Sequence, residues 1–570
     1  MPTAASAPTL TDGVVTLRTL VMADLAAVVE QSQDPETVRW TFVPRPYTEA
    51  DGREFIDRTA QGWREDTGCG WAIEHDGRFA GLISYQPRGG GAVEVAYAAH
   101  PAARGRGVMT RAVPLVATHA FEHGATAVLW HARLGNFRSR KVAWRCGFTI
   151  GGPVVSTHRD QVVEAWAGHL RPGELMEPRG RWLLPPVLEH DGIRVRPFRE
   201  EDGGALPERH DRLSALFSAN LPTRGSYAAW LQGRRTLEAT GSAVACAVVD
   251  AISDELLGGI DLHRLDVPLF AGTGILGFWL VEGARGHGAV SRALELVIPW
   301  SFEPLADGGL GLHALSASCS VDNVASARVL RRAGFAPVGT ARQSMRAEAA
   351  LTGAVHDAVH DELLFDLLAT DNRDAQRIEP IRLPVVETPR FRLRTWGPDD
   401  VPTPDEGPDD DSLRFMPPLA HPNHQTYAAW LSRHARFADS GVGLDWCVAD
   451  RETDHALGNV TVFGLDPGPA GFQAELGYWL HPAFRGQGVL GEVLPAVIDH
   501  AFRSTAESGL GLTRLHAATV LENAASQAVL RRAGFRPWGQ DRQAWRNSRG
   551  ELTDGAFFEL LATDPRPTER

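Results

Sequence analysis

The sequence is poor in lysine and in cysteine. Lys141 is the only lysine among the 57 lysine and arginine residues. The five cysteines form neither a CxxC pair nor a cluster with histidine; they are Cys69, Cys146, Cys246, Cys319 and Cys447. This spacing is not that of a zinc site or a disulfide framework, so we expect no metal centre. Unpaired thiols favour a reducing, cytoplasmic location.

Long apolar runs are also missing. None approaches the roughly 20 residues that spanning a bilayer requires, and Met1-Pro-Thr-Ala-Ala-Ser lacks the basic and apolar regions of an export signal. The formal net charge of −13 disfavours binding to a phosphate backbone. We therefore expect a cytoplasmic protein with no membrane span and no nucleic-acid partner. The acidity is compatible with an amine-bearing substrate.

The sequence does contain a motif that occurs three times. An Arg-Gly-x-Gly loop follows a strand-like run and opens an amphipathic stretch at Arg104, Arg285 and Arg485. Asn-x-x-Ser follows each arginine 32 or 38 residues later, and a Gly-Phe pair ends twelve residues after each Asn. The downstream residues are Asn136, Ser139 and Phe148; Asn323, Ser326 and Phe335; and Asn523, Ser526 and Phe535. Three matching copies indicate a triplicated domain.

The repeat divides the 570 residues into three domains, as the usual size of domains also predicts. We predict domain 1 at residues 1–172, domain 2 at 187–371 and domain 3 at 388–570. Pro-rich linkers are predicted at 173–186 and 372–387. Strand and helix patterns alternate within each domain. The fold class is therefore α/β (α+β), with a mixed central sheet flanked by helices in each domain.

The strand, the Arg-Gly-x-Gly loop and the helix together favour a phosphate site. Glycines let consecutive backbone N–H groups face one concavity, and the start of the helix adds partial positive charge. The arginine can add a charge-assisted contact. The loop lacks the Gly-Lys-Ser/Thr end of a Walker loop and the third glycine of a GxGxxG motif. A tight turn with a glycine cap is the alternative interpretation.

The strand that enters the loop carries a glutamate in two of the three domains. These are Glu94 in domain 1 and Glu475 in domain 3, and side-chain alternation along the strand places each beside its loop. A carboxylate in this position can act as a general base, directly or through one water. The alternative is an exposed or cross-strand-paired glutamate. Ile275 holds the position in domain 2, so we predict that domain 2 is degenerate.

The Asn-x-x-Ser segment also matches the start of a helix. Asn is a preferred N-cap residue, and Gly147, Gly334 and Gly534 suit the position just after a helix end. The cap accounts for the Asn whether or not the same side chain also contacts a ligand.

Together these residues resemble the GNAT superfamily of N-acetyltransferases, in its RimJ/RimL-like branch, over almost the whole chain except the linkers. The resemblance implies that the loops hold the pyrophosphate of acetyl-CoA or another acyl-CoA, beside a splayed strand. It also implies that the Asn side chains contact the pantetheine arm. The implied cofactor-binding residues are Arg104, Gly105, Arg106, Gly107, Val108 and Asn136; Arg285, Gly286, Gly288 and Asn323; and Arg485, Gly486, Gln487, Gly488, Val489 and Asn523.

The implied reaction is direct transfer of an acyl group from a thioester to an amine, without a metal. Glu94 or Glu475 is the implied base, and Ser139 or Ser526 the acid that protonates the thiolate. Backbone N–H groups of the splayed strand would stabilise the developing oxyanion by roughly 3–4 kcal/mol per donor. The implied acceptor is a peptide, a protein N-terminal amine or a small amine. Domain 3 is the most complete copy, and domain 1 follows.

Two other functions stay open. One is transfer of a longer acyl chain from an acyl carrier protein to a peptide amine in natural-product (lipopeptide) biosynthesis. The other is a non-catalytic acyl-CoA-binding scaffold or sensor. The retained Glu94 and Glu475 argue against the second.

Overall fold

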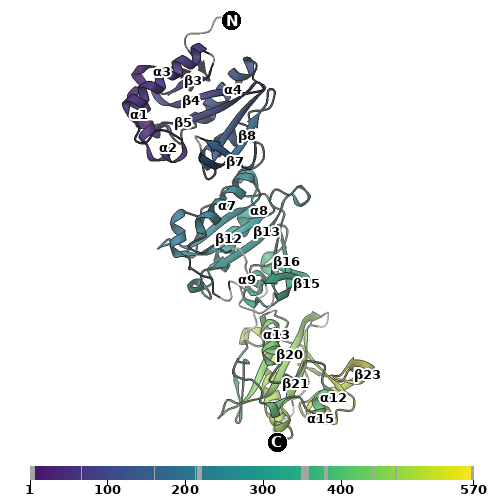
Figure 1. Cartoon of the computed structure of the whole chain (residues 1–570). Helices are drawn as coiled ribbons and strands as arrows, with labels where there is room; N and C mark the ends of the chain where they lie inside the picture. Colours follow the sequence, from purple (N-terminus) through teal and green to yellow (C-terminus); the bar gives the residue numbers. More distant parts are fainter. Residues whose placement is uncertain are drawn as a thin grey trace.

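Three domains follow one another along an elongated molecule (Figure 1). The computed structural model describes residues 7–65, 67–158, 161–211, 214, 221–347, 358–377, 383–439, 441–468 and 471–566. Each domain contains one eight-stranded sheet. The predicted α/β (α+β) architecture, with three tandem mixed sheets flanked by helices, is therefore confirmed. Residues 1–6, which were expected to lack an export signal, lie outside the described residues.

The main elements of domain 1 are β1 (Leu10–Thr11), β2 (Val15–Arg18), α1 (Leu25–Gln33), α2 (Pro35–Trp40), α3 (Glu49–Glu65), β3 (Cys69–His75), β4 (Arg78–Gly89), β5 (Ala92–Ala99), α4 (Val108–Glu122), β6 (Ala127–Arg133), α5 (Phe137–Arg145), β7 (Thr149–His158) and β8 (Gln161–Leu170). Those of domain 2 are β9 (Leu188–His190), β10 (Ile193–Pro197), α7 (Tyr227–Thr240), β11 (Val244–Asp250), β12 (Leu256–His263), β13 (Thr273–Leu280), α8 (Ala289–Phe302), β14 (Ala314–Ser320), α9 (Val324–Arg332), β15 (Ala336–Ala347) and β16 (Ala358–Leu368). Those of domain 3 are β17 (Val386–Glu387), β18 (Phe391–Arg394), α12 (Asp410–Phe415), α13 (Tyr427–Asp439), β19 (Gly443–Asp450), β20 (Ala456–Gly468), β21 (Gly471–Leu480), α14 (Val489–Phe502), β22 (Arg514–Val520), α15 (Ala524–Arg532), β23 (Arg536–Arg546) and β24 (Leu552–Leu561).

The three sheets have the same strand order. In domain 1 it is β1-β2-β3-β4-β5-β6-β8-β7, and the other two sheets repeat it with their own strands. One neighbouring pair in each sheet is parallel, namely β5–β6, β13–β14 and β21–β22. A helix joins the two strands of each parallel pair, because parallel neighbours need a long crossover connection. These crossover helices are α4, α8 and α14.

Each sheet separates two layers of helices. In domain 1, Ala112, Val113, Val116 and Ala120 form one buried face of α4 at helical spacing and pack on the sheet. The opposite sheet face packs with Val28 of α1 and other residues of α1 and α3. Burial of each large apolar side chain contributes about 1.5–3 kcal/mol before the entropy of ordering is subtracted. The crossover helices are therefore fixed firmly on one face of each sheet.

The two connections between domains differ from each other. Residues 173–186 contain no helix or strand, but Trp182 packs on Trp144 and lies 5.5 Å from the Lys141 ammonium. Leu183 belongs to the core of domain 2. In the second connection, Arg373–Gln376 forms a short helix, α11, and the first strand of domain 3 begins at Val386. Residues 378–382 of that predicted linker lie outside the described residues.

Helices among the described residues are all too short or too polar to cross a membrane. The same part of the chain has no group of three or more His, Cys, Asp or Glu side chains arranged to hold a metal ion.

Candidate active site

The parallel pair in each sheet comes apart partway along its length. The β5–β6 pairing ends at Val95 and Trp130, whereas β5 continues to Ala99. The β21–β22 pairing ends at Glu475 and His516, whereas β21 continues to Leu480. The strand edges beyond these points do not pair with each other, which leaves backbone groups there for another partner. This is the splayed strand that the resemblance implies.

The loop after the splayed strand has the backbone of an anion site. In domain 3, Gly486 and Gly488 have φ values of 74° and 75°, a left-handed conformation that suits glycine. The glycine pairs at 105 and 107 and at 286 and 288 do the same. A Cβ atom on Gly486 would meet no heavy atom within 4 Å, so the space in front of the loop is open.

The helix after each loop starts without a side-chain cap. Gly107, Gly288 and Gly488 are the N-cap residues of α4, α8 and α14. The N-cap glycines therefore supply no side-chain acceptor for the first-turn N–H groups of these helices, as an anion site requires. The buried side chains of Val108 and Val489 anchor the first turns in the core. Arg106 and Gln487 are exposed on the loops. These features fit a pyrophosphate group.

The loop arginine has an unexpected partner inside the protein. Arg485 Nη1 lies 2.8 Å from Asp409 Oδ2, and its Nη2 donates to Ser412 Oγ at 2.7 Å. Arg285 pairs with Asp211 at 2.7 Å. Arg104 pairs with Asp34, whose pKa is lowered to about 2 chiefly by that arginine. All three arginines thus fasten their loops to a neighbouring segment, and direct contact with a pyrophosphate stays a prediction.

Glu475 stands at the last paired position before β21 leaves β22. Its pKa is raised by burial, and no ion pair involving it is found among the described residues. Gly477 lies two residues further along the same strand face, where a Cβ atom would come within 3.1 Å of Thr461 and 3.3 Å of Phe463. A desolvated carboxylate without a cation is a stronger base than an exposed one, so the site of domain 3 suits proton removal.

Glu94 has a different environment in domain 1. Its Oε2 lies 2.6 Å from Arg88 Nε, and its Oε1 lies 3.2 Å from His131 Nδ1. The pKa of Glu94 is lowered, because the bonds from His131 and Arg88 outweigh burial. The paired glutamate that the sequence left open as an alternative is therefore the geometry here. It makes Glu94 a weaker base than Glu475.

Domain 2 has no carboxylate at this place. Ile275 faces His263 across the β12–β13 pair, and His263 Nε2 lies 2.6 Å from Asp261 Oδ1. This His–Asp pair stands on the neighbouring strand rather than on the splayed one. The predicted degeneracy of domain 2 stays a prediction.

The Asn-x-x-Ser segments begin helices, as expected. The side-chain oxygens of Asn136, Asn323 and Asn523 accept from the N–H of the third residue on, at 3.1, 3.1 and 3.0 Å. The carboxamide oxygen is thus used by the cap, and the NH₂ group is the part suited to donate to a ligand. Gly147, Gly334 and Gly534 have φ values of 77°, 89° and 96°, which confirms them as helix-end glycines.

The two candidate acids each have a tyrosine partner that sequence reasoning missed. Tyr478 Oη lies 2.9 Å from Ser526 Oγ, and Tyr97 Oη lies 3.1 Å from Ser139 Oγ. Burial raises the pKa of Tyr478 to about 12, so the phenol keeps its proton. A signal was present in the sequence. A tyrosine stands three residues after each glutamate, and domain 2, which lacks the glutamate, has Phe278 instead.

Known proteins similar to this chain include acetyltransferases. A family model described as an acetyltransferase (GNAT) domain matches residues 15–149, 193–336 and 390–536. Ribosomal-protein-serine acetyltransferase of Escherichia coli (strain K12) is 36% identical over 91 residues, which cover 16% of this chain and 47% of that protein. Probable N-acetyltransferase YjcK of Bacillus subtilis (strain 168) is 29% identical over 99 residues, covering 17% and 51%. The chain spans about half the length of these relatives.

Solved structures with similar folds include two ribosomal-protein acetyltransferases. RimL, a ribosomal L7/L12 α-N-protein acetyltransferase in complex with coenzyme A, is 16% identical with a TM-score of 0.27, covering 29% of this chain and 98% of that one. A ribosomal-protein-S5-alanine acetyltransferase from Vibrio fischeri is 22% identical with a TM-score of 0.28, covering 33% and 98%. The family match recurs in all three domains and spans most of the sequence, so this chain belongs to the GNAT family of acetyltransferase enzymes.

Proposed function

We propose that this protein transfers an acetyl group from acetyl-CoA to a primary amine, and that the amine is the N-terminus of a peptide or protein. The observation that carries the proposal is the geometry at the splay of domain 3. There Glu475 and the Tyr478–Ser526 pair stand on opposite faces of one strand, just before a glycine loop that fits a phosphate. The similarity to ribosomal-protein-serine acetyltransferase of Escherichia coli supports the choice of acceptor.

The donor would be held by backbone more than by side chains. The N–H groups of Gly486, Gly488 and Val489 would bind the pyrophosphate, and the Asn523 NH₂ group would donate to the pantetheine arm. When bound, acetyl-CoA supplies an activated acetyl thioester. Domain 1 would use the matching residues Gly105, Gly107, Val108 and Asn136.

The protein's own residues would handle the protons. Glu475 would take a proton from the acceptor ammonium, so that the neutral amine can attack. Ser526, which is hydrogen-bonded to Tyr478, would donate a proton to the sulfur of the departing thiolate. Glu94, Ser139 and Tyr97 would do the same in domain 1. Domain 2 lacks both the glutamate and the tyrosine, so we propose that it does not catalyse transfer.

The experiment is mass spectrometry of a peptide pool after incubation with the full chain. Separate reactions contain acetyl-CoA, octanoyl-CoA and an acyl-loaded carrier protein. We expect a gain of one acetyl group at peptide N-termini with acetyl-CoA. Transfer only from the carrier protein would replace this proposal with the lipopeptide reaction. Tight acetyl-CoA binding without any product would indicate a sensor.

The cytoplasmic location is part of the same proposal. All five cysteines are buried, which is compatible with a reducing compartment. Fractionation of producing cells, with detection of the chain by antibody, would test the location.

A further inference from the structure

Domain 1 contains a cavity of about 720 Å³ on the sheet face that carries Glu94. Helices α1, α2 and α3 form one side, and strands β3, β4 and β5 form the other. Ala96 and Ala98, the next two residues of β5 on the face of Glu94, are part of its wall. The cavity therefore begins beside the candidate base and extends under the helices.

Large aromatic side chains fill the corresponding space in domains 2 and 3. The aromatic members of the domain 2 cluster are Phe198, Tyr227, Trp230 and Trp279, and those of the domain 3 cluster are Trp396, Tyr427, Trp430 and Trp479. Their geometries match. Trp279 meets Trp230 edge-on at 6.4 Å and 88°, and Trp479 meets Trp430 edge-on at 6.1 Å and 75°. Two copies have therefore closed this space in the same way.

The decisive position lies six residues before the loop arginine. It is Ala98 in domain 1, and Trp279 and Trp479 in the others. The strand register confirms the equivalence. Ala98 stands opposite Leu82, Trp279 opposite Gly259 and Trp479 opposite Asn459, each on the strand before. A second wall residue is also smaller in domain 1. Leu20 takes the place of Phe198 and Trp396, each two residues after the equivalent strand arginine, Arg18, Arg196 or Arg394.

We propose that the cavity of domain 1 binds the bulky apolar group of the acceptor amine. The size of the side chain at position 98 determines whether the cavity is open to that group. Trp479 restricts domain 3 to acceptors without such a group. The inference rests on the proposed function, because it names the acceptor class of that site. The chain would thus hold two transfer sites of different acceptor size.

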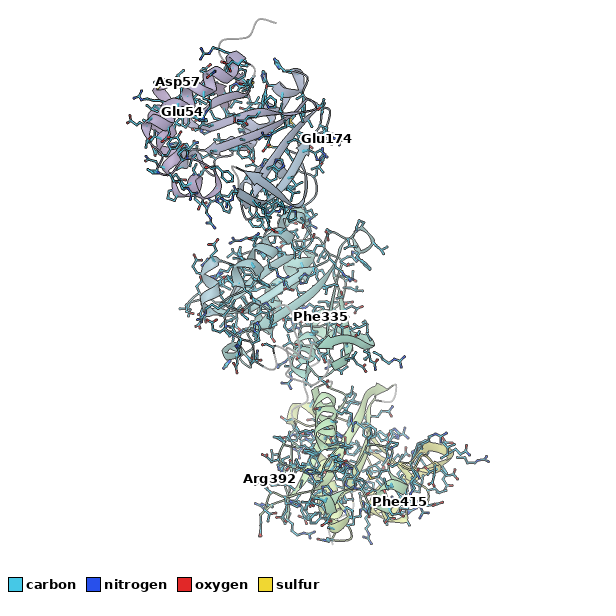
Figure 2. All side chains as sticks on the ribbon, in the orientation of Figure 1. Glu54, Asp57, Glu174, Phe335, Arg392 and Phe415 are labelled. Carbon is cyan, nitrogen blue, oxygen red and sulfur yellow. The ribbon has the colours of Figure 1, made fainter. Side chains whose placement is uncertain are left out.

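The lining supports an acceptor that is apolar and cationic. Val28, Phe55, Trp71 and Ile83 are among its apolar residues, and they suit a large hydrocarbon or aromatic group. Asp51 and Glu54 add carboxylates from α3, with Arg58 as the accompanying cation. Figure 2 shows Glu54 at the outer edge of domain 1. An amine that carries an ammonium group and an apolar side chain matches both the apolar lining and the carboxylates. Two kinds of molecule have this chemistry: a peptide with a bulky first residue and a free arylalkylamine.

The test uses the full chain, its Ala98→Trp variant and three probes: Phe-Ala-Ala amide, Ala-Ala-Ala amide and phenethylamine. Calorimetric titration without any donor gives affinity and stoichiometry. We expect Ala98→Trp to lower the affinity for Phe-Ala-Ala amide at least tenfold. The affinity for Ala-Ala-Ala amide should change less than twofold. Trp479→Ala should add a second site for Phe-Ala-Ala amide. If phenethylamine binds as tightly as Phe-Ala-Ala amide, the acceptor that the cavity selects is a free arylalkylamine rather than a peptide.

Acetyl-CoA affinity is measured in parallel, so that two failures can be told apart. Absence of acetyl-CoA binding would overturn the proposed function, while the peptide titration would still decide the role of the cavity. A folded Ala98→Trp protein that binds Phe-Ala-Ala amide like the wild type would overturn the inference. Loss of octanoyl-CoA binding alone would assign the cavity to the donor's acyl chain, which also overturns it. If Ala98→Trp does not fold, Ala98→Leu gives the same comparison with a smaller expected loss of about threefold.

Discussion

Arg485 and Asp409 join the phosphate-type loop of domain 3 to the start of helix α12. The carboxylate of Asp409 caps that helix by accepting from the Ser412 N–H at 2.9 Å, and it holds Arg485 at 2.8 Å. Arg104–Asp34 repeats the arrangement at the start of α2, and Arg285–Asp211 repeats the ion pair in domain 2. The arginine therefore positions the loop before any ligand is bound.

Arg485→Ala should loosen the loop and weaken donor binding. Loss of a charge-assisted, partly exposed pair is worth about 1–2 kcal/mol, which corresponds to a roughly 5–30-fold rise in the Kd for acetyl-CoA at domain 3. Arg285→Ala is the matched control, and we expect it to reduce overall transfer less, because domain 2 lacks the glutamate. A larger loss from Arg285→Ala would make domain 2 the working copy. Titration calorimetry and steady-state kinetics give both values.

Glu475→Gln should slow transfer without weakening donor binding. Removal of a general base costs about 10²–10⁴-fold in rate, and the loop proposed to hold the donor begins at Arg485, ten residues further along the chain. The measurement is kcat for a small peptide such as Ala-Ala-Ala amide, together with the Kd for acetyl-CoA. Unchanged turnover would remove Glu475 from the mechanism.

The pKa values of the two glutamates should lie on opposite sides of the ordinary value for a glutamate carboxyl group. Burial raises the pKa of Glu475, whereas His131 and Arg88 lower that of Glu94. A general base works deprotonated, so kcat/KM rises as the pH passes upward through its pKa. The acidic limb of the wild-type profile should therefore lie at higher pH than that of the Glu475→Gln variant. The activity that remains in the variant depends on Glu94. An acidic limb that stays in place would show that Glu475 does not control it.

The same shift has a consequence for stability. Because the folded-state pKa of Glu475 is raised, its contribution to stability is present at low pH and is lost as the pH rises through that pKa. Glu475→Gln cannot ionise, so the variant should be at least as stable as the wild type above the Glu475 pKa. Melting temperatures across the pH range would check this.

Tyr478 and Ser526 should act as one proton-donating pair. We expect Tyr478→Phe and Ser526→Ala each to lower kcat about 100-fold, and the double variant to lose little more, because the second change removes an interaction already broken. Tyr227→Phe is the control for the loss of a phenol, since the Tyr227 hydroxyl donates to the Arg199 carbonyl in domain 2. If the loss of kcat in the double variant equals the product of the two single losses, Tyr478 and Ser526 act independently and the prediction is wrong.

Much of this site could be predicted because it depends on local rules. Gly486 and Gly488 need positive φ, and Asn523 caps the helix that it precedes, so short motifs are enough to place them. The partner of Arg485 could not be predicted, because Asp409 is 76 residues away and caps a helix that the loop motif does not include. The pairing of Glu94 with His131 depends on the register of β5 and β6, which alternation along one strand does not fix.

A buried ion pair of domain 2 should dominate local stability. Arg196 donates to both oxygens of Asp202, at 2.9 and 2.7 Å, and both side chains are almost fully buried. Asp202→Ala would leave the guanidinium with Asp254 alone, whose Oδ1 lies 3.0 Å from the Arg196 Nε, at a cost of about 1–3 kcal/mol. Hydrogen exchange of the β10 and β11 amides measures this loss within domain 2, because a chain of several domains is not expected to unfold as one two-state unit. The exposed pair Arg224–Glu208 is the control; Arg224→Ala should cost less than about 1 kcal/mol.

Lys141 lies against the ring of Trp182, where burial lowers the pKa of its ammonium. No other side-chain amine is present in the sequence. Modification of the enzyme by its own activated substrate is therefore confined, among lysines, to a single residue beside the first linker. A mass increase on the intact chain during a labelling reaction can then be traced to one lysine. A chain carrying Lys141→Arg would offer no lysine to label, so that every labelled lysine in a reaction mixture would belong to a substrate.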